Sequence, residues 1–460
     1  MSAKKKRIKV PERPAEERIN DFKEVSLGYT PEQAIKEANR CLQCENRPCT
    51  EGCPVGINIP LFIKKIREEK FREALEILKK DNFIPAITGR VCPQEDQCEN
   101  RCTMRKMDDP INIGKLERFV ADYVREKDRE KEPEKKKKNK GSIGIVGSGP
   151  SGITCAGTLS KSGYDVSIYE ALHEAGGVLK YGIPEFRLPN EIINHELDYL
   201  KKLGVEIKVN KIVGQNIFID EIEEIHDAIY VATGAGAPRF LGLEGENLNG
   251  IYSANEFLTR INLMKAYKFP EYDTPITDME KVAIIGGGNV AIDSARSALR
   301  LGAESHILYR RTVDWAPARE EEIQHAKEEG VQFDCLCSPI KFIGDQEGWL
   351  KEIEFCETEL CEPNGSGRPK PKSVEDSRFR KSFDTAIIAI GQKPNKVLHR
   401  NTSGLEVRDD GRIIIDDKTR NTTREKVYAG GDAVSGIATV IQAMGDGQKA
   451  ARSIEKNLET

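Results

Sequence analysis

Hydrophobic positions follow two different patterns along this chain. Residues 31–40 and 60–80 carry apolar residues at helical spacing, which in the second segment are Leu61, Ile63, Ile66, Phe71, Leu75 and Leu78. From residue 141 onward, short apolar runs alternate with helical patterns, which is typical of parallel α/β folds. We therefore expect a small all-helical N-terminal domain followed by α/β structure.

A highly charged segment separates the two parts. Residues 126–140 are mostly Lys and Glu, with four consecutive lysines at 135–138. A solvated linker explains this composition better than a nucleic-acid site does. We expect residues 1–125 to form a separate domain whose removal leaves the α/β part folded.

The first α/β segment contains a glycine-rich nucleotide fingerprint. An apolar run at 142–146 is followed by Gly147, Gly149, Pro150 and Gly152, then by a helical segment and a second apolar run that ends at Glu170. Glycines let backbone N–H groups approach a pyrophosphate at a helix N-terminus, and the acidic residue suits ribose hydroxyls. A tight turn without a ligand is the alternative, but the complete pattern favours a dinucleotide site.

A second fingerprint begins at residue 286 and consists of Gly286, Gly287, Gly288, Asn289 and Val290. Glu170 lies 23 residues after Gly147, whereas the position 23 residues after Gly286 is Tyr309, followed by Arg310 and Arg311. Two guanidiniums in place of a carboxylate suit the 2′-phosphate of NADP. We expect Arg319 to assist them; the alternative is a surface arginine pair.

Seven cysteines lie close together before either fingerprint: Cys41, Cys44, Cys49, Cys53, Cys92, Cys98 and Cys102. The first four, with Pro54 after the last, approach the ferredoxin pattern of iron–sulfur ligands. A disulfide framework would prefer an even count. Zinc is the stronger rival, but no histidine precedes His173. Two [4Fe-4S] clusters need eight ligands, and Glu117 is our candidate for the eighth.

The composition of the chain mainly excludes other classes of protein, such as nucleic-acid-binding and membrane proteins. A chain of 460 residues fits about three domains. A net charge of −4 gives no reason to expect nucleic acid. No apolar run approaches the roughly 20 residues that cross a bilayer, so we expect no membrane insertion. The cysteines at 155, 335, 337, 356 and 361 lack ligand spacing and are expected to be small apolar side chains.

Small residues follow two further predicted strands, at positions where the backbone can approach a ligand closely. Thr233 and Gly234 follow the apolar run at 228–231, and Gly431 and Asp432 follow the one at 426–429. The whole resembles flavoproteins with two dinucleotide-binding domains, in which a Rossmann-like NADP domain is inserted into the FAD domain. The resemblance implies FAD segments at 141–253 and 376–460 and an NADP domain at 254–375, with Asp432 near the ribityl chain. A redox Cys-x-x-Cys is missing from the second domain, so thioredoxin reductase is excluded.

Three longer motifs narrow the resemblance: residues 85–93, 176–189 and 430–433 are similar to the glutamate synthase small-subunit family. The family implies crossed ligation, with Cys41, Cys44, Cys49 and Cys102 on one cluster and Cys53, Cys92, Cys98 and Glu117 on the other. It also implies FAD contacts at Gly177, Val178, Arg187 and Thr439. Residues 253–268 are most similar to the large subunits of NADH-dependent ferredoxin:NADP oxidoreductases.

The resemblance implies a cytoplasmic oxidoreductase that transfers hydride from NADPH to FAD and single electrons to two [4Fe-4S] clusters. Within the closer group, it implies a hetero-oligomer with a smaller flavoprotein or iron–sulfur subunit, and electron bifurcation toward ferredoxin. A small subunit of NADPH-dependent glutamate synthase is the first alternative. An electron-transfer adaptor in a larger hydrogenase or dehydrogenase complex is the second.

Overall fold

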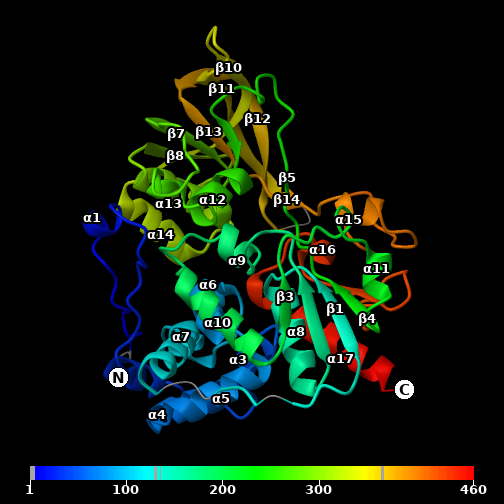
Figure 1. Ribbon diagram of the computed structural model, residues 1–460. Helices are drawn as coiled ribbons and strands as arrows, with labels where there is room; N and C mark the ends of the chain where they lie inside the picture. Colours follow the sequence, from blue (N-terminus) through cyan, green and yellow to red (C-terminus); the bar gives the residue numbers. More distant parts are fainter. Residues whose placement is uncertain (1–5, 129–131, 135, 364–366, 460) are drawn as a thin grey trace.

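The N-terminal part of the chain is helical, as its apolar periodicity predicts (Figure 1). The computed structural model describes residues 6–128, 132–134, 136–363 and 367–459; the start of the chain and part of the expected linker (129–131 and 135) lie outside this range. The helices of this part are α1 (Ala15–Arg18), α2 (Pro31–Ala38), α3 (Pro48–Glu51), α4 (Ile59–Arg67), α5 (Phe71–Asp81), α6 (Pro85–Val91) and α7 (Ile113–Tyr123).

The single helix expected at 60–80 is two helices, α4 and α5. The chain reverses between them at Glu69, whose φ of 58° lies in the left-handed region, and Lys70 N–H donates to Lys65 O over 2.9 Å. A left-handed residue cannot continue an α-helix. Leu61, expected on the buried face, has 38% of its surface exposed, whereas Ile63 and Ile66 are buried.

The first α/β unit is a five-stranded parallel sheet in the order β15-β4-β1-β2-β3. Its strands are β1 (Ser142–Val146), β2 (Asp165–Tyr169), β3 (Glu206–Lys208), β4 (Ala228–Val231) and β15 (Val427–Ala429). The accompanying helices are α8 (Pro150–Ser162), α9 (Val178–Tyr181), α10 (Asn190–Lys202), α11 (Ile219–Glu223), α15 (Val397–Arg400), α16 (Asp432–Ser435) and α17 (Val440–Leu458). The C-terminal strand β15 pairs with β4, so both ends of the α/β part build one sheet.

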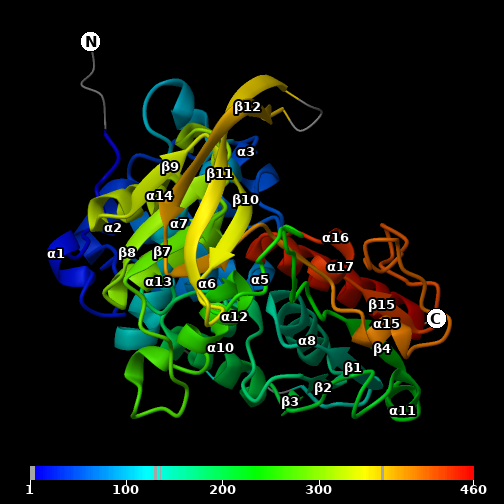
Figure 2. The ribbon, with the colours of Figure 1, turned by 90° about the horizontal axis from the view of Figure 1, so that it is seen from above.

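A second five-stranded parallel sheet has the order β6-β13-β7-β8-β9. Its strands are β6 (Ile251–Ser253), β7 (Lys281–Ile285), β8 (Glu304–Tyr309), β9 (Gln332–Cys335) and β13 (Thr385–Ile388), with helices α12 (Ala254–Asn262), α13 (Asn289–Arg300) and α14 (Glu320–Glu329). An antiparallel sheet of β10 (Cys337–Gly344), β11 (Leu350–Pro363) and β12 (Pro369–Ser382) projects from it, as the view from above shows (Figure 2).

The chain crosses between the two sheets twice, on paired short strands. β5 (Ala237–Pro238) runs antiparallel to β14 (Gln392–Lys393). The predicted division at 253/254 and 375/376 stays a prediction, but strand pairing favours boundaries nearer to these two strands. β6 and β13 both belong to the second sheet, and the 375/376 boundary falls inside β12.

The helical part and the first α/β unit share one hydrophobic core. Phe83 and Leu116 of the helical part belong to the same buried cluster as Ile145 and Met444 of the α/β part. A Cβ added to Gly157 would lie 2.2 Å from the ring of Phe83, so helix α8 is in close contact with this ring. Removing residues 1–125 would expose this core, contrary to our expectation of a separable domain.

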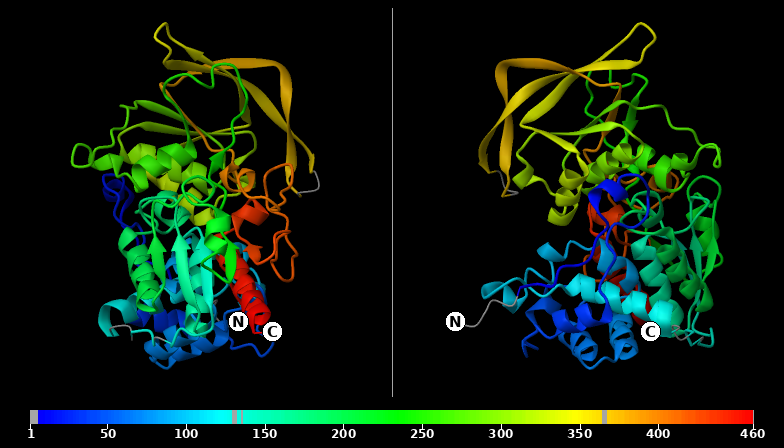
Figure 3. Two further views of the ribbon diagram at one scale, coloured as in Figure 1. Left: turned by 45° about the vertical axis from the view of Figure 1, so that its right-hand side comes forward. Right: turned by 90° about the vertical axis from the view of Figure 1, so that its left-hand side faces the viewer.

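The N-terminal segment 6–30 lies along the outside of the molecule as a strap (Figures 1 and 3). Phe22 stacks on Tyr267 at 4.1 Å between ring centroids, and Val25 N–H donates to Phe186 O over 3.0 Å. Arg18 is buried against Glu329 of α14. The strap therefore connects the helical part to the second α/β unit. No helix in the described part of the chain is long and apolar enough to cross a membrane.

Candidate functional site

The first glycine loop joins β1 to α8 and forms a cradle of bare backbone. A Cβ at Gly147 would lie 2.5 Å from Ala232 O, and one at Gly152 would lie 2.0 Å from Gly147 O. Gly149 instead faces open space, because a Cβ added there would have no other atom within 4 Å among the described residues. Two glycines thus serve the turn and the third leaves room above the N-terminus of α8, which suits a pyrophosphate.

Glu170 lies at the end of β2, where its carboxylate orders the glycine loop. Oε2 accepts a 3.0 Å hydrogen bond from Ser148 N–H, Oε1 accepts one of 2.9 Å from Leu172 N–H, and the Ser148 hydroxyl also donates to Oε2. Gly176 N–H donates to Ser148 Oγ over 2.9 Å. Sequence reasoning missed Ser148, whose only signal was its place between two glycines of the fingerprint.

The other expected FAD residues lie around the same loop or at the ends of neighbouring strands. A Cβ at Gly177 would lie 2.8 Å from Gly149 Cα, which places the start of α9, at Val178, beside the cradle. Thr233 and Gly234 directly follow β4, the neighbour of β1. A Cβ at Gly431 would lie 3.2 Å from Ser151 Cβ in the first turn of α8.

Asp432 begins α16 and Thr439 caps α17. Asp432 Oδ1 accepts a 2.6 Å hydrogen bond from Ala438 N–H, and burial raises the pKa of this carboxyl. Gly431 N–H donates over 3.0 Å to Oδ2 of Asp446, which also pairs with Arg420. Asp446 holds the Gly431–Asp432 turn in place and was missed, because it lies inside a helix with no motif around it.

The second glycine loop repeats this geometry between β7 and α13. Gly286 has a φ of 148°, and a Cβ on Gly287 would lie 2.7 Å from the Tyr309 ring. A Cβ on Gly288 would meet only Pro317 among the described residues, at 3.9 Å, so this side of the loop is open. Asn289 and Val290 begin α13.

The expected phosphate-binding arginines differ in their surroundings. Arg310 is exposed, and its guanidinium makes no hydrogen bond or ion pair with any described residue. Arg311 is buried, with Nε donating to Pro369 O over 2.8 Å. The arrangement leaves Arg310 available to an anion and gives Arg311 a role in attaching β12.

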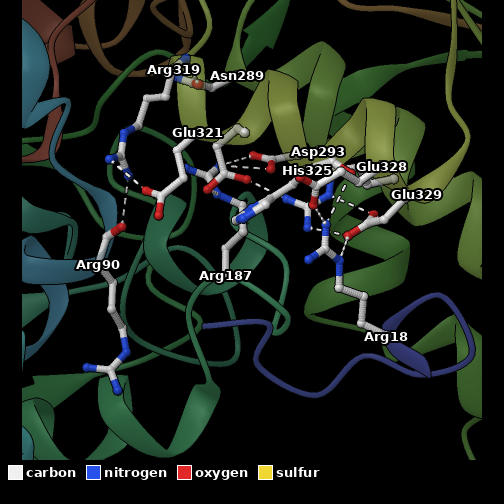
Figure 4. A network of polar contacts seen from close by, with 12 residues as sticks. Arg18, Arg90, Arg187, Asn289, Asp293, Arg319, Glu321, His325, Glu328 and Glu329 are labelled. Atoms are coloured by element: carbon white, nitrogen blue, oxygen red, sulfur yellow. Dashed lines mark hydrogen bonds and ion pairs between the residues drawn. The ribbon is translucent and has the colours of Figure 1, made fainter. Parts of the chain in front are cut away.

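Two arginines expected at the nucleotides have their guanidiniums in a buried ion network instead (Figure 4). Arg187 lies against Asp293 at 2.6 Å and Glu322 at 2.9 Å, which holds the first α/β unit to α13 and α14. The two acids hold the pKa of Arg187 above its ordinary value. Arg319 points toward the helical part, although its backbone N–H donates to Asn289 Oδ1 over 2.9 Å. Sequence spacing could not show that these cations already have carboxylate partners.

Four cysteines line one pocket of the helical part: Cys41, Cys44, Cys49 and Cys102. All four are half-buried free thiols, and the remaining wall is mostly apolar, with Ile59, Pro60 and Ile63 from α4. Gln43 Nε2 lies 3.3 Å from Cys41 Sγ, and Thr103 Oγ1 lies 3.4 Å from Cys44 Sγ. Four thiols around an apolar pocket fit an iron–sulfur cluster.

The other three cysteines, Cys53, Cys92 and Cys98, gather with Glu117 of α7. Burial raises the pKa of each thiol, and the charge of Glu117 acts in the same direction on all three. Burial also raises the pKa of Glu117 to about 7, although Asn82 Nδ2 and the Thr88 hydroxyl donate to its Oε1. Asn82 and Thr88 were missed; their hydrogen bonds hold the Glu117 carboxylate in place. Three thiols and a carboxylate fit the ligand set of a second cluster.

The pocket lined by Cys41, Cys44, Cys49 and Cys102 is called the outer pocket below, and Cys53, Cys92, Cys98 and Glu117 are called the buried thiol set. Residues next to the buried thiol set contact the first α/β unit. A Cβ at Gly445 of α17 would be 3.1 Å from Pro54 O, next to Cys53. Gln97 Nε2, next to Cys98, donates to Thr439 Oγ1 over 3.2 Å. The start of α17 therefore contacts the loops that carry Cys53 and Cys98.

Comparison with known proteins agrees with this geometry. Residues 18–129 match the family described as dihydropyrimidine dehydrogenase domain II, 4Fe-4S cluster, and residues 141–447 match the pyridine nucleotide-disulphide oxidoreductases. FprA of Mycobacterium tuberculosis, solved in complex with NADPH, shares the α/β fold with a TM-score of 0.58 and 22% identity over 69% of this chain and 84% of its own.

Three curated relatives are similar over most of this chain. The glutamate synthase [NADPH] small chain of Escherichia coli is 32% identical over 98% of this chain and 97% of its own length. The putative oxidoreductase AegA of Escherichia coli is 34% identical over 95% and 68%. The NADP(+)-dependent formate dehydrogenase subunit beta of Moorella thermoacetica is 35% identical over 89% and 60%.

The fold and the site thus define an NADPH-dependent oxidoreductase that joins a 4Fe-4S domain to FAD- and NADP-binding domains. More particularly, the chain belongs to the glutamate synthase small-chain family. The family predicted from the sequence motifs is confirmed, as is the α-helical domain followed by two Rossmann-like units.

Proposed function

We propose that the chain is the NADPH-oxidising subunit of a hetero-oligomer and holds FAD, NADP(H) and two [4Fe-4S] clusters. When bound, FAD accepts hydride from NADPH, and the clusters carry single electrons onward. The observation that supports the proposal is that one chain combines two open glycine loops, a set of thiols whose loops contact α17, and a pocket lined by four half-buried cysteines.

The chain's own residues bind and position in this proposal. Gly149 and Gly288 leave backbone open to the FAD and NADP pyrophosphates, and Arg310 offers a guanidinium to the 2′-phosphate. Cys53, Cys92, Cys98 and Glu117 hold the inner cluster, and the outer pocket holds the other. No proton transfer by a side chain is needed at any of these positions.

The face around the outer pocket suits a protein partner. Leu42 and Met107 expose 50% and 59% of their surface, and each follows a cysteine of the pocket closely in sequence. Exposed apolar side chains beside a half-exposed cofactor site are typical of docking surfaces. Relatives of the chain are named as subunits: a small chain and two beta subunits.

The identity of the partner would distinguish three particular assignments. One is the large subunit of an electron-bifurcating NADH-dependent ferredoxin:NADP oxidoreductase, which rests on the likeness of residues 253–268. Another is the small subunit of glutamate synthase, which the match over 97% of such a chain favours. An adaptor in a hydrogenase or dehydrogenase complex, of the kind the formate dehydrogenase relative suggests, is the third.

Purification of the native complex from its source distinguishes these assignments. A smaller flavoprotein partner, with ferredoxin reduction by NADPH that requires NAD⁺, supports the bifurcating assignment. A larger partner that forms glutamate from glutamine and 2-oxoglutarate supports the second. A chain that purifies alone and reduces one-electron acceptors without a partner contradicts the hetero-oligomer.

A further inference from the structure

Arg319 links the second glycine loop to the helical part of the molecule. It immediately precedes α14, and its backbone N–H donates to the side chain of Asn289, which begins α13 after the glycines. Its own side chain is 4% exposed and extends away from the nucleotide loop, toward Arg90 (Figure 4). One residue therefore contacts the NADP loop with its backbone and another domain with its guanidinium.

The guanidinium binds the segment that leads into the buried thiol set. Nη1 donates to Arg90 O over 3.1 Å, Nη2 to Gln94 Oε1 over 3.0 Å, and Nε to Glu95 Oε1 over 3.1 Å. These three acceptors flank Cys92 on both sides. A planar guanidinium fork can satisfy all three at once, which a lysine ammonium cannot do from one position.

The first turn of α14 makes a second link to the same set. Glu321 Oε1 accepts from Lys115 Nζ over 2.6 Å, and Glu321 Oε2 pairs with Arg319 Nη2 over 3.0 Å. Lys115 lies on α7, two residues before Glu117. The start of α14 thus contacts two of the three chain segments that supply this ligand set, the one with Cys92 and Cys98 and the one with Glu117.

Arg319 also brings a buried positive charge close to these ligands. Its guanidinium is buried and donates to Arg90 O and Gln94 Oε1, which lie on either side of Cys92 in the chain. Reduction adds negative charge to a cluster, so a nearby cation stabilises the reduced state. Burial limits the screening of this effect by solvent.

We propose that Arg319 is a positioning residue that couples nucleotide binding at the second glycine loop to reduction of the inner cluster. Nucleotide contacts at Asn289 act on Arg319, which fixes the Cys92 segment and sets the charge beside it. Because coupling is reciprocal, reduction of the cluster changes NADP⁺ affinity by the same factor. This inference rests on the proposed function, since it requires the inner cluster.

Redox titration of the complete holoprotein, followed by EPR, tests the coupling. The inner cluster's midpoint potential is measured with and without saturating NADP⁺ in wild type, Arg319→Gln, Arg319→Lys and the control Arg260→Gln. Arg260 is an exposed arginine of the same unit, paired along α12 with Glu256. In the wild type we expect the nucleotide to shift the potential by the equivalent of an about fivefold or larger change in affinity.

Arg319→Gln is expected to lower the nucleotide-free potential and to abolish the shift, and Arg319→Lys to keep the potential but lose most of the shift. Arg260→Gln is expected to change neither. A wild-type potential that is insensitive to NADP⁺ overturns the proposal, and so does an Arg319→Gln protein with unchanged potential and shift. If Arg319→Gln does not fold, the shift in Arg319→Lys decides. Wild-type iron content for one cubane only contradicts the proposed function itself and is recognised before any variant is made.

Discussion

At the scale of single residues, the carboxylate of Glu117 is subject to two opposing effects on its pKa, burial and hydrogen bonding. Burial raises its pKa to about 7, whereas the hydrogen bonds from Thr88 and Asn82 favour the ionised form. A carboxyl held by two donors and grouped with the half-buried thiol of Cys53 and the buried thiols of Cys92 and Cys98 is suited to bind a cation. Metal ligation offsets the cost of burying these groups.

Replacement of Glu117 by Ala is expected to remove or alter one of two cubanes, because that cluster then lacks its fourth ligand. Iron analysis and EPR of the purified variant measure this. Glu99→Gln is the matched control: Glu99 is also buried in this part but pairs with Arg7, so its loss should leave both clusters in place. Two unaltered cubanes in Glu117→Ala would exclude the carboxylate as a ligand.

Arg310 and Arg311 provide a second residue-scale prediction, since only the first has a guanidinium without a described partner. Arg310→Ala should weaken NADPH binding by about tenfold to a hundredfold, the cost of one charge-assisted phosphate contact, and NADH binding much less. Arg311→Ala should mainly lower thermal stability. Flavin reduction by each nucleotide, titrated over concentration, measures the effect. Equal loss for NADH and NADPH in Arg310→Ala would contradict a phosphate contact.

Motif residues were the easiest to predict from sequence, because spacing indicates which glycines make a turn, and the family resemblance implies which cysteines lie together. The residues that orient the motif residues through hydrogen bonds could not be predicted. Ser148, Asn82 and Asp446 act through hydrogen bonds to residues 15 to 35 positions away, for which the sequence holds no pattern. The ion pairs of Arg187 and Arg319 were not predicted for the same reason, because most of their carboxylate partners come from distant segments.

At the scale of elements, the strand–loop–helix unit determines what each glycine tolerates. Gly149→Ala should leave the fold intact, since its Cβ would face open space, but should weaken FAD binding. Gly152→Ala should destabilise the protein, because its Cβ would lie 2.0 Å from Gly147 O. Each effect is expected to cost about 1–3 kcal/mol. FAD titration and thermal unfolding of both apoproteins measure this pair, and an unstable Gly149→Ala apoprotein would contradict the cradle.

His226 connects two strands of the first sheet and gives this unit a pH dependence. Its ring lies between Ser142 Oγ at 2.6 Å and Tyr169 OH at 2.9 Å, and burial, with Lys208 nearby, lowers its pKa below 6.5. A lowered histidine pKa means that its contribution to stability is present above pH 6.5 and is lost as pH falls toward the folded-state pKa. The melting temperature can be measured by the release of flavin on heating. It should fall more between about pH 7.5 and about pH 5.5 in wild type than in His226→Gln. Equal falls would contradict this assignment.

Helices and strands were predicted best where apolar residues recur in the sequence at a regular spacing or in continuous runs. The strands at 142–146 and 165–169 occur as expected, because buried parallel strands are continuous apolar runs. The break between α4 and α5 was missed, since Glu69 adopts a left-handed conformation that its residue type does not announce. The long hairpin of β11 and β12 is charged on its exposed faces and has no clear apolar alternation in sequence.

At the scale of the whole molecule, the cysteine-rich part and the first α/β unit are one folded body, and the strap and the ion network of Figure 4 attach the second unit to both. Sequence indicated the order of these parts but not their contacts. A shared core and buried ion pairs depend on residues that are distant in the chain. The proposed electron path must therefore be tested in the intact protein rather than by truncation.

In the proposed function, electrons from NADPH enter at the flavin and leave through the outer cysteine pocket. The most direct measurement mixes the complete holoprotein rapidly with NADPH and follows flavin bleaching, cluster EPR and reduction of the native partner or ferredoxin. Wild type is compared with Cys41→Ala/Cys49→Ala and with Cys361→Ala, an exposed cysteine of β11. We predict that flavin bleaching keeps its rate in all three proteins, while acceptor reduction is lost only in the double variant. Acceptor reduction at the wild-type rate in the double variant, which lacks the outer cluster, would contradict the proposed electron path.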